Sequence, residues 1–159
     1  MTSASDSARQ RALEPLILAR AEGLPAGRLV EHHQVQLGAG SFVDIDGAIV
    51  DDDGTLLAVM EVFTTLGPLK AGQKNKLKGD ILKLAAFVEP PAAKVIVTTS
   101  PTAHAWLTGQ SWCAEAARRL GITIAPVVPL TAEERAELEA TRASQRRGMA
   151  AGESADADG

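Results

Sequence analysis

The strongest constraint on the fold is a hairpin pattern in the first half of the sequence. Residues 42–50 place alternate side chains on opposite faces, with Asp44 and Asp46 on the same face, as in a β-strand. The acidic run that follows ends in Asp53 and Gly54, a pair that supplies the positive φ of a tight turn. Residues 55–63 are mostly apolar, which predicts a strand buried on both faces. The rest of the chain must be organised around this antiparallel pair.

Apolar periodicity and helix-breaking residues define the other elements. Helical spacing of apolar residues predicts helices, and short apolar runs bounded by Gly or Pro predict strands. The predicted helices cover residues 8–22, 73–88 and 101–120, with a possible break near Gly109, and a charged helix follows from Thr131 to about Arg146. The remaining predicted strands cover residues 29–37, 94–99 and 122–128.

This order predicts an α/β protein with a mixed sheet flanked by helices. We expect a single domain over residues 10–130 and a C-terminal charged helix over residues 131–147, which opens with the capping-box pair Thr131 and Glu134. Residues 1–9 and 148–159 are small and polar, and we expect them to be disordered.

Composition narrows the functional classes. A chain of 159 residues is long enough for one domain with a real core. Its single cysteine excludes an internal disulfide, and no run is apolar enough for a signal peptide or membrane span, so we expect a cytoplasmic protein. The formal net charge is -4, so any nucleic-acid binding must depend on a local basic patch.

Asp46 and Glu61 are the first candidates for chemistry. If the hairpin forms, they lie on neighbouring strands with their carboxylates close together. Two hard oxygen ligands suit Mg²⁺ or Mn²⁺, and such a site can promote attack on a phosphate. Asp44 shares the face of Asp46 and could replace or assist it. The alternative is a solvated strand face, with Glu61 simply paired to a lysine.

A lysine-rich segment follows the hairpin. Five lysines stand against one acid, Asp80, within fourteen residues: Lys70, Lys74, Lys76, Lys78 and Lys83. They form a local positive segment that could bind a phosphate backbone. One of these amines could instead stabilise charge beside the metal. The alternative is an ordinary solvated helix face.

Gln73 stands at the expected start of the same helix. Its amide could position a water or a phosphate, or it could cap the helix. No Cys or His spacing indicates a zinc site, and nothing near Cys113 supplies the base that a nucleophile needs.

The order of these elements and acids resembles the PD-(D/E)XK nuclease superfamily, whose restriction-endonuclease-like core runs α-β-β-β-α-β-α-β. In that superfamily an acid lies on the second strand and Glu-x-Lys on the third. VDIDGAIV supplies the first acid as Asp46, and LLAVMEVF supplies the second as Glu61. Gln73 resembles a glutamine that several branches carry in the next helix. GPLKAGQKNKLKGDILKL is similar to a small group of uncharacterised bacterial proteins with this fold, and the resemblance covers residues 10–128.

One residue departs from the superfamily pattern: Phe63 stands where the third-strand lysine is expected. Lys70 or Lys76 are the candidate replacements, and Lys74 is a weaker one. The resemblance implies a Mg²⁺- or Mn²⁺-dependent nuclease acting on DNA, with a homodimer or a partner protein supplying specificity. Phe63 favours the alternative, an inactive nucleic-acid-binding or assembly module. A small-molecule enzyme using the same carboxylates is a third reading.

Overall fold

The computed structural model describes the backbone over residues 4–38 and 40–153, and the side chains over residues 11–38 and 40–144. A five-stranded mixed sheet forms its centre, in the order β1-β2-β3-β4-β5. β1, β2 and β3 are antiparallel, whereas β4 and β5 run parallel to β3. The strands are β1 (Arg28–Gly38), β2 (Ser41–Val50), β3 (Leu56–Phe63), β4 (Ala93–Thr98) and β5 (Ile122–Ile124). The predicted mixed sheet with flanking helices is confirmed.

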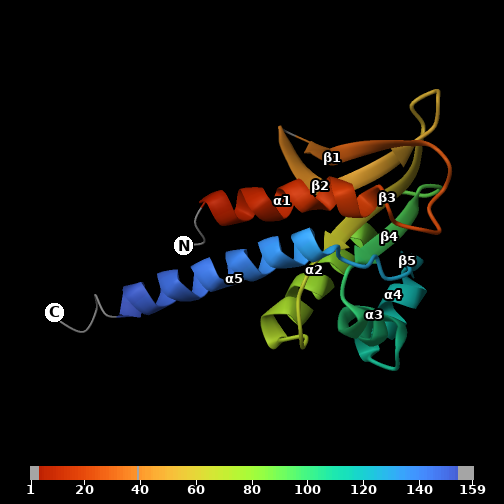
Figure 1. Ribbon diagram of the computed structural model, residues 1–159. Coiled ribbons are helices and arrows are strands. Elements are labelled where there is room, and N and C mark those ends of the chain that lie inside the picture. The colour runs from red at the N-terminus through yellow and green to blue at the C-terminus, as the bar shows by residue number, and fades with distance from the viewer. Residues whose placement is uncertain (1–3, 39, 154–159) are drawn as a thin grey trace.

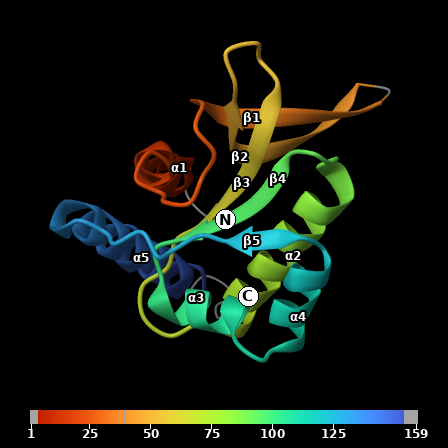
Figure 2. The same ribbon diagram turned by 90° about the vertical axis from the view of Figure 1, so that its right-hand side faces the viewer.

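Helices cover both faces of the sheet. They are α1 (Ala4–Leu18), α2 (Ala71–Phe87), α3 (Pro101–Thr108), α4 (Trp112–Arg119) and α5 (Ala132–Glu153). Figure 2 shows α1 and α5 on one side of the sheet and α2, α3 and α4 on the other. Two parallel connections lead from β3 to β4 and from β4 to β5, and helices fill them, as parallel strands require.

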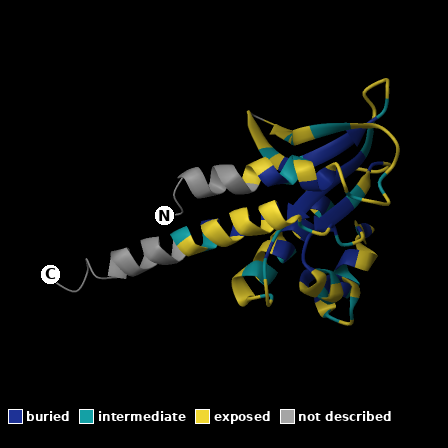
Figure 3. Cartoon of the chain, in the orientation of Figure 1, coloured by how far each residue is buried: buried dark blue, intermediate teal, exposed yellow. Residues whose placement is uncertain are grey.

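The core is divided between these two faces because successive residues of β3 point in opposite directions. Val59 and Phe63 pack with Leu77 and Leu84 of α2. Met60 and Val62 belong to the other core, which includes Leu13 and Ile17 of α1 and Leu138 of α5. Figure 3 shows the buried residues concentrated along the central strands. β3 is therefore buried on both faces, as its composition predicts.

The predicted hairpin between β2 and β3 is present. Oδ1 of Asp51 accepts hydrogen bonds from the main-chain N–H groups of Asp53 and Thr55, at 3.0 and 2.7 Å. Gly54 has a φ of 81°, which a residue with a side chain rarely adopts. The local turn chemistry thus fixes the pairing of the two strands that carry Asp46 and Glu61.

Both terminal helices are longer than predicted. α1 begins at Ala4, so residues 4–9, expected to be disordered, are helical in backbone. α5 extends to Glu153, beyond the expected end near residue 147. Neither segment contains proline, and each has two alanines, the best helix former. Gly148 and Gly152 weaken the extension of α5 but do not end it before Glu153. The rest of the predicted disorder, residues 1–3 and 154–159, lies outside the described residues.

The possible break near Gly109 is confirmed, and one other predicted boundary changes. α3 ends at Thr108 because Gly109 leaves the helical conformation, with a ψ of -147°, and Ser111 caps α4. The last strand ends at Ile124 rather than at residue 128, because Pro126 cannot donate to a ladder.

The charged helix α5 is fixed at its N-terminal end. The predicted capping box is present: Thr131 N–H donates to Glu134 Oε2, and Glu134 N–H donates to Thr131 Oγ1. Arg20, which follows α1, donates to both carboxylate oxygens of Glu134, at 2.7 and 2.8 Å. No helix of the described chain combines the length and the apolar character needed to cross a membrane.

Candidate active site

The candidate site lies where β2 and β3 separate. Their ladder ends with Gly47 opposite Met60. Beyond this pair, Oδ2 of Asp46 accepts a hydrogen bond from the main-chain N–H of Val62 at 2.7 Å, in place of the next ladder contact. Glu61 is adjacent and only 1% exposed. The structure thus brings Asp46 and Glu61 together at one point of the sheet, as the hairpin predicts.

Lys83 supplies the amine at this point. Its Nζ donates to Glu61 Oε1 at 2.6 Å and to the carbonyl oxygen of Asp44 at 3.0 Å. Lys83 lies in the second half of α2, which crosses the same face of the sheet. The expected replacements, Lys70 and Lys76, lie before α2 and in its first half. Lys83 was predicted only as a nucleic-acid contact, so its place beside Glu61 is a finding of the tertiary structure.

Lys76 lies on the same side of α2 and borders the site. Its Nζ is 2.8 Å from Asp80 Oδ2, and Asp80 is 5% exposed. Burial acts to lower the pKa of Lys76, but the attractions of Asp80, Asp46 and Glu61 outweigh it and raise the pKa. Lys76 is thus close enough to interact with the carboxylates, although Lys83 makes the direct contact.

The carboxylates of Asp46, Glu61 and Asp80 form a cluster with the amines of Lys76 and Lys83. Burial, with repulsion from Asp46, raises the pKa of Glu61 to about 8, and the hydrogen bond from Lys83 offsets only part of this. Burial also raises the pKa of Asp80, against the attraction of Lys76. The raised pKa of Glu61 means that the cluster holds a proton near neutral pH, and a bound cation could take the place of that proton.

Glu14 of α1 is a member of the cluster that the sequence analysis missed. Burial raises its pKa to about 7, and the charge of Asp46 adds to the shift, whereas Lys76 and Arg11 act against it. The signal in the sequence was weak: Glu14 follows Leu13, which is buried, on a helix that packs against the sheet. Nothing local indicates which acid of this helix faces the hairpin.

The remaining lysines of the segment do not join this cluster. Lys74 lies over the ring of Trp106 and Lys78 over that of Trp112, with Nζ 5.8 and 5.3 Å from the ring centroids. Lys70 precedes α2, and its main-chain N–H donates a hydrogen bond to Gln73 Oε1. Residues at different angles around a helix cannot share one patch, so the four lysines of α2 are divided between the carboxylates and the tryptophans.

Gln73 has the capping role that was the alternative for it. Its Oε1 accepts a hydrogen bond from the main-chain N–H of Lys70 at 2.9 Å, and its Nε2 donates to Thr65 Oγ1. Asp44 is likewise engaged elsewhere, because its Oδ1 accepts from Gln34 Nε2 at 2.9 Å on an exposed strand face. Both residues border the site, and their side-chain hydrogen bonds serve the structure.

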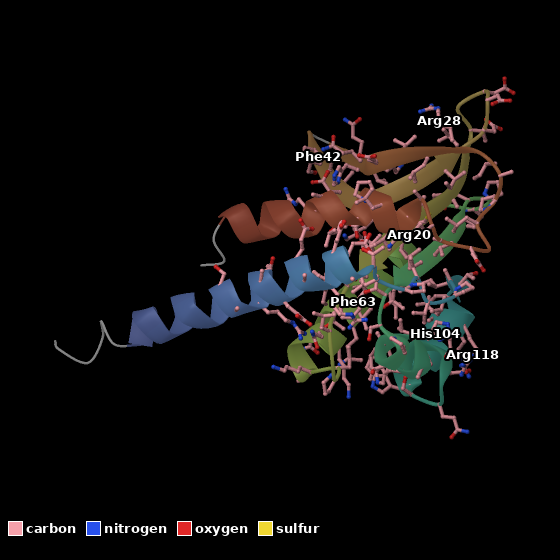
Figure 4. All side chains as sticks on the ribbon, in the orientation of Figure 1. Arg20, Arg28, Phe42, Phe63, His104 and Arg118 are labelled. Carbon is pink, nitrogen blue, oxygen red and sulfur yellow. The ribbon has the colours of Figure 1, made fainter. Side chains whose placement is uncertain are left out.

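Phe63 explains why the amine comes from α2. The ring is 2% exposed and packs in the core between β3 and α2, with Lys76 Nζ 5.8 Å from its centroid. Figure 4 shows Phe63 in the interior, near α2 and α5. A lysine at this position would bury its charge in an apolar core, whereas Lys83 reaches Glu61 from a helix position that is partly exposed.

A metal would have to be held by few protein ligands. Among the described residues, no group of three or more His, Cys, Asp or Glu side chains is arranged to hold a metal ion. Asp46 and Glu61 remain as a pair of hard ligands, and Mg²⁺ commonly uses one or two carboxylates and keeps several waters. The carboxylate oxygens of this pair are the kind of donor that such an ion prefers.

Comparison with known proteins does not place the chain in a family. No protein-family model matches the chain, and no curated protein matches it significantly in sequence.

Proposed function

We propose that this chain is a small metal-dependent nuclease of the PD-(D/E)XK type that hydrolyses phosphodiester bonds in DNA. The observation that carries the proposal is the 2.6 Å contact between Lys83 Nζ and Glu61, beside Asp46. The superfamily that the sequence resembles holds a lysine amine next to its second acid. Here α2 supplies an amine at that place, although Phe63 occupies the usual lysine position.

The strand arrangement also supports the proposal. An antiparallel β1-β2-β3 meander, followed by α2 and the parallel strand β4, is the arrangement that the resemblance leads us to expect. The two acids stand on the second and third strands, where these strands separate. The restriction-endonuclease-like topology is therefore part of the proposal.

Asp46 and Glu61 would hold Mg²⁺ or Mn²⁺. When bound, such an ion supplies Lewis-acid polarisation of the phosphate and lowers the pKa of the attacking water. Lys83 orients the Glu61 carboxylate and stabilises negative charge that develops on the phosphate. Lys76 contributes a second positive charge next to the same carboxylates.

The test is incubation of the protein with plasmid, linear and single-stranded DNA in Mg²⁺, Mn²⁺ or EDTA. We expect cleavage only with metal, and a loss of about 100-fold or more in Asp46→Asn, Glu61→Gln and Lys83→Met. Asp52→Asn, in the exposed turn, and Lys94→Met, on β4, serve as charge-matched controls that keep full activity.

Absence of cleavage by the folded protein on every substrate and metal would refute the nuclease proposal. Retention of DNA by that inactive protein would favour the non-catalytic binding module, the reading that Phe63 supports. Equal activity in Lys83→Met and in the wild-type protein would remove the assigned role of the α2 amine.

A further inference from the structure

A cavity of about 250 Å³ lies beside the candidate site, between the end of β3, the first turns of α2 and α5. Figure 1 shows the start of α5 close to α2 and the end of β3. Two cations, Lys76 and Arg142, line it, and no Asp or Glu of the described residues does. In a protein of net charge -4, a cationic cavity next to an acidic cluster needs an explanation.

Arg142 of α5 has a neutral partner in this cavity. Its Nη2 donates to Thr65 Oγ1 at 3.0 Å. None of the ion pairs formed by the described side chains includes Arg142. A guanidinium carries five N–H donors in a planar fork that matches carboxylate or phosphate oxygens. Among the described side chains, this partly buried guanidinium contacts one hydroxyl and no carboxylate, so it has unused capacity for an anion.

Thr65 adds a hydroxyl group to the same cavity. It is 6% exposed, and its Oγ1 accepts hydrogen bonds from both Gln73 Nε2 and Arg142 Nη2. A hydroxyl that accepts two hydrogen bonds uses both lone pairs, so its O–H proton is left to donate to another acceptor. A ligand with several acceptor oxygens and a negative charge would satisfy Thr65 and Arg142 together.

Lys76 connects the cavity to the acidic cluster. It lines the cavity, its ammonium group pairs with Asp80 at 2.8 Å, and it also interacts electrostatically with Asp46 and Glu61. A phosphate in the cavity would therefore stand next to the point at which these carboxylates act.

We propose that this cavity is a phosphate subsite in which Arg142, Lys76 and the Thr65 hydroxyl bind one phosphate of the nucleic acid, next to the phosphate that is cleaved. The inference rests on the proposed nuclease function and names the recognition part of the same site. A terminal phosphate and an internal phosphodiester share the required chemistry. α5, which lies outside the expected domain, becomes a substrate-binding element.

The experiment measures binding in EDTA, so that no cleavage occurs. The probes are inorganic phosphate, detected by thermal stabilisation of the protein, and a short single-stranded oligonucleotide with either a 5′-phosphate or a 5′-hydroxyl. Arg142→Gln is compared with Arg135→Gln, which removes the same charge from an exposed position of the same helix. Thr65→Val removes the hydroxyl and keeps the side-chain shape.

We expect Arg142→Gln to weaken the binding of phosphate and oligonucleotide roughly tenfold or more, Thr65→Val to weaken it less, and Arg135→Gln to leave it unchanged. A preference of the wild-type protein for the 5′-phosphate, lost in Arg142→Gln, identifies a terminal phosphate. Equal weakening of both oligonucleotides identifies an internal one. Unchanged phosphate binding in a folded Arg142→Gln protein, or equal losses in the two arginine variants, would overturn the subsite.

These outcomes are separate from those of the cleavage test. Loss of phosphate binding in Arg142→Gln concerns the subsite alone, because no metal is present. Failure of DNA cleavage with intact phosphate binding would remove the nuclease and leave a phosphate-binding module.

Discussion

Replacing Lys83 by methionine tests whether the buried pair with Glu61 organises the site. Lys83 Nζ is 2.6 Å from Glu61 Oε1, and the two side chains are 26% and 1% exposed. At this distance, with an effective dielectric constant near 20, the attraction is about 6 kcal/mol. Desolvation of both charges cancels much of it, and removing one partner of such a pair typically costs about 3–5 kcal/mol.

The cost should depend on pH. Because burial raises the pKa of Glu61 to about 8, the folded protein takes up a proton there that the unfolded chain, with its ordinary value of 4.5, does not hold. Stability from this group therefore falls as the pH rises from 4.5 through 8. Removing Lys83 raises the pKa further, so Glu61 of the variant stays neutral at pH 6 without cost. At pH 9 the variant must either hold the proton against the solution pH or bury an unpaired charge, and both lower its stability.

We expect Lys83→Met to lower the free energy of unfolding by about 1 kcal/mol at pH 6, the value of a hydrogen bond, and by about 3 kcal/mol at pH 9. Urea unfolding followed by circular dichroism, in EDTA, measures both values. Adding Glu61→Gln should restore most of the loss at pH 9. The pairing would be refuted if Lys83→Met lowered the free energy of unfolding equally at the two pH values, or if Glu61→Gln did not restore the loss at pH 9. Lys94→Met is the control.

Three further predictions concern the scaffold. The ion pair between the exposed Arg20 and the buried Glu134 ties α5 to the end of α1. Arg20→Met should cost about 1 kcal/mol at pH 7, and the loss should disappear as the pH falls below 4.5 through the lowered pKa of Glu134, measured by urea unfolding. Leu77→Ala should cost about 3 kcal/mol, because Leu77 is fully buried against β3. Gly47→Ala should cost about 1–3 kcal/mol, because its Cβ would stand 2.6 Å from a methyl group of Leu18.

Each of these has a contradicting result. An Arg20→Met deficit that persists at pH 3 would exclude the ionised Glu134 as its cause. Losses below about 1 kcal/mol for Leu77→Ala or Gly47→Ala would mean looser packing than the contacts indicate. Thermal and urea unfolding of each variant, compared with the wild-type protein, measure these losses.

Local chemistry determined the parts of the site that lie on the hairpin. Asp53 and Gly54 fix the turn, and the turn fixes the pairing of the strands that carry Asp46 and Glu61. The two acids could therefore be placed together from the sequence. The capping residues of α3 and α5 were equally local, since Ser100, Thr131 and Glu134 bond within three residues of themselves.

The amine, Glu14 and Arg142 depended on the tertiary structure. Lys83 is 22 residues from Glu61 in sequence, and Arg142 is 77 from Thr65. The apolar periodicity of a helix predicts neither the angle at which α2 crosses the sheet nor which turn of α5 packs against the end of β3. The sequence was enough to predict the strands, the hairpin and the position of the two carboxylates, because each follows from neighbouring residues. Helix packing alone decided which cations meet them, because side chains distant in the chain become neighbours only when the layers close.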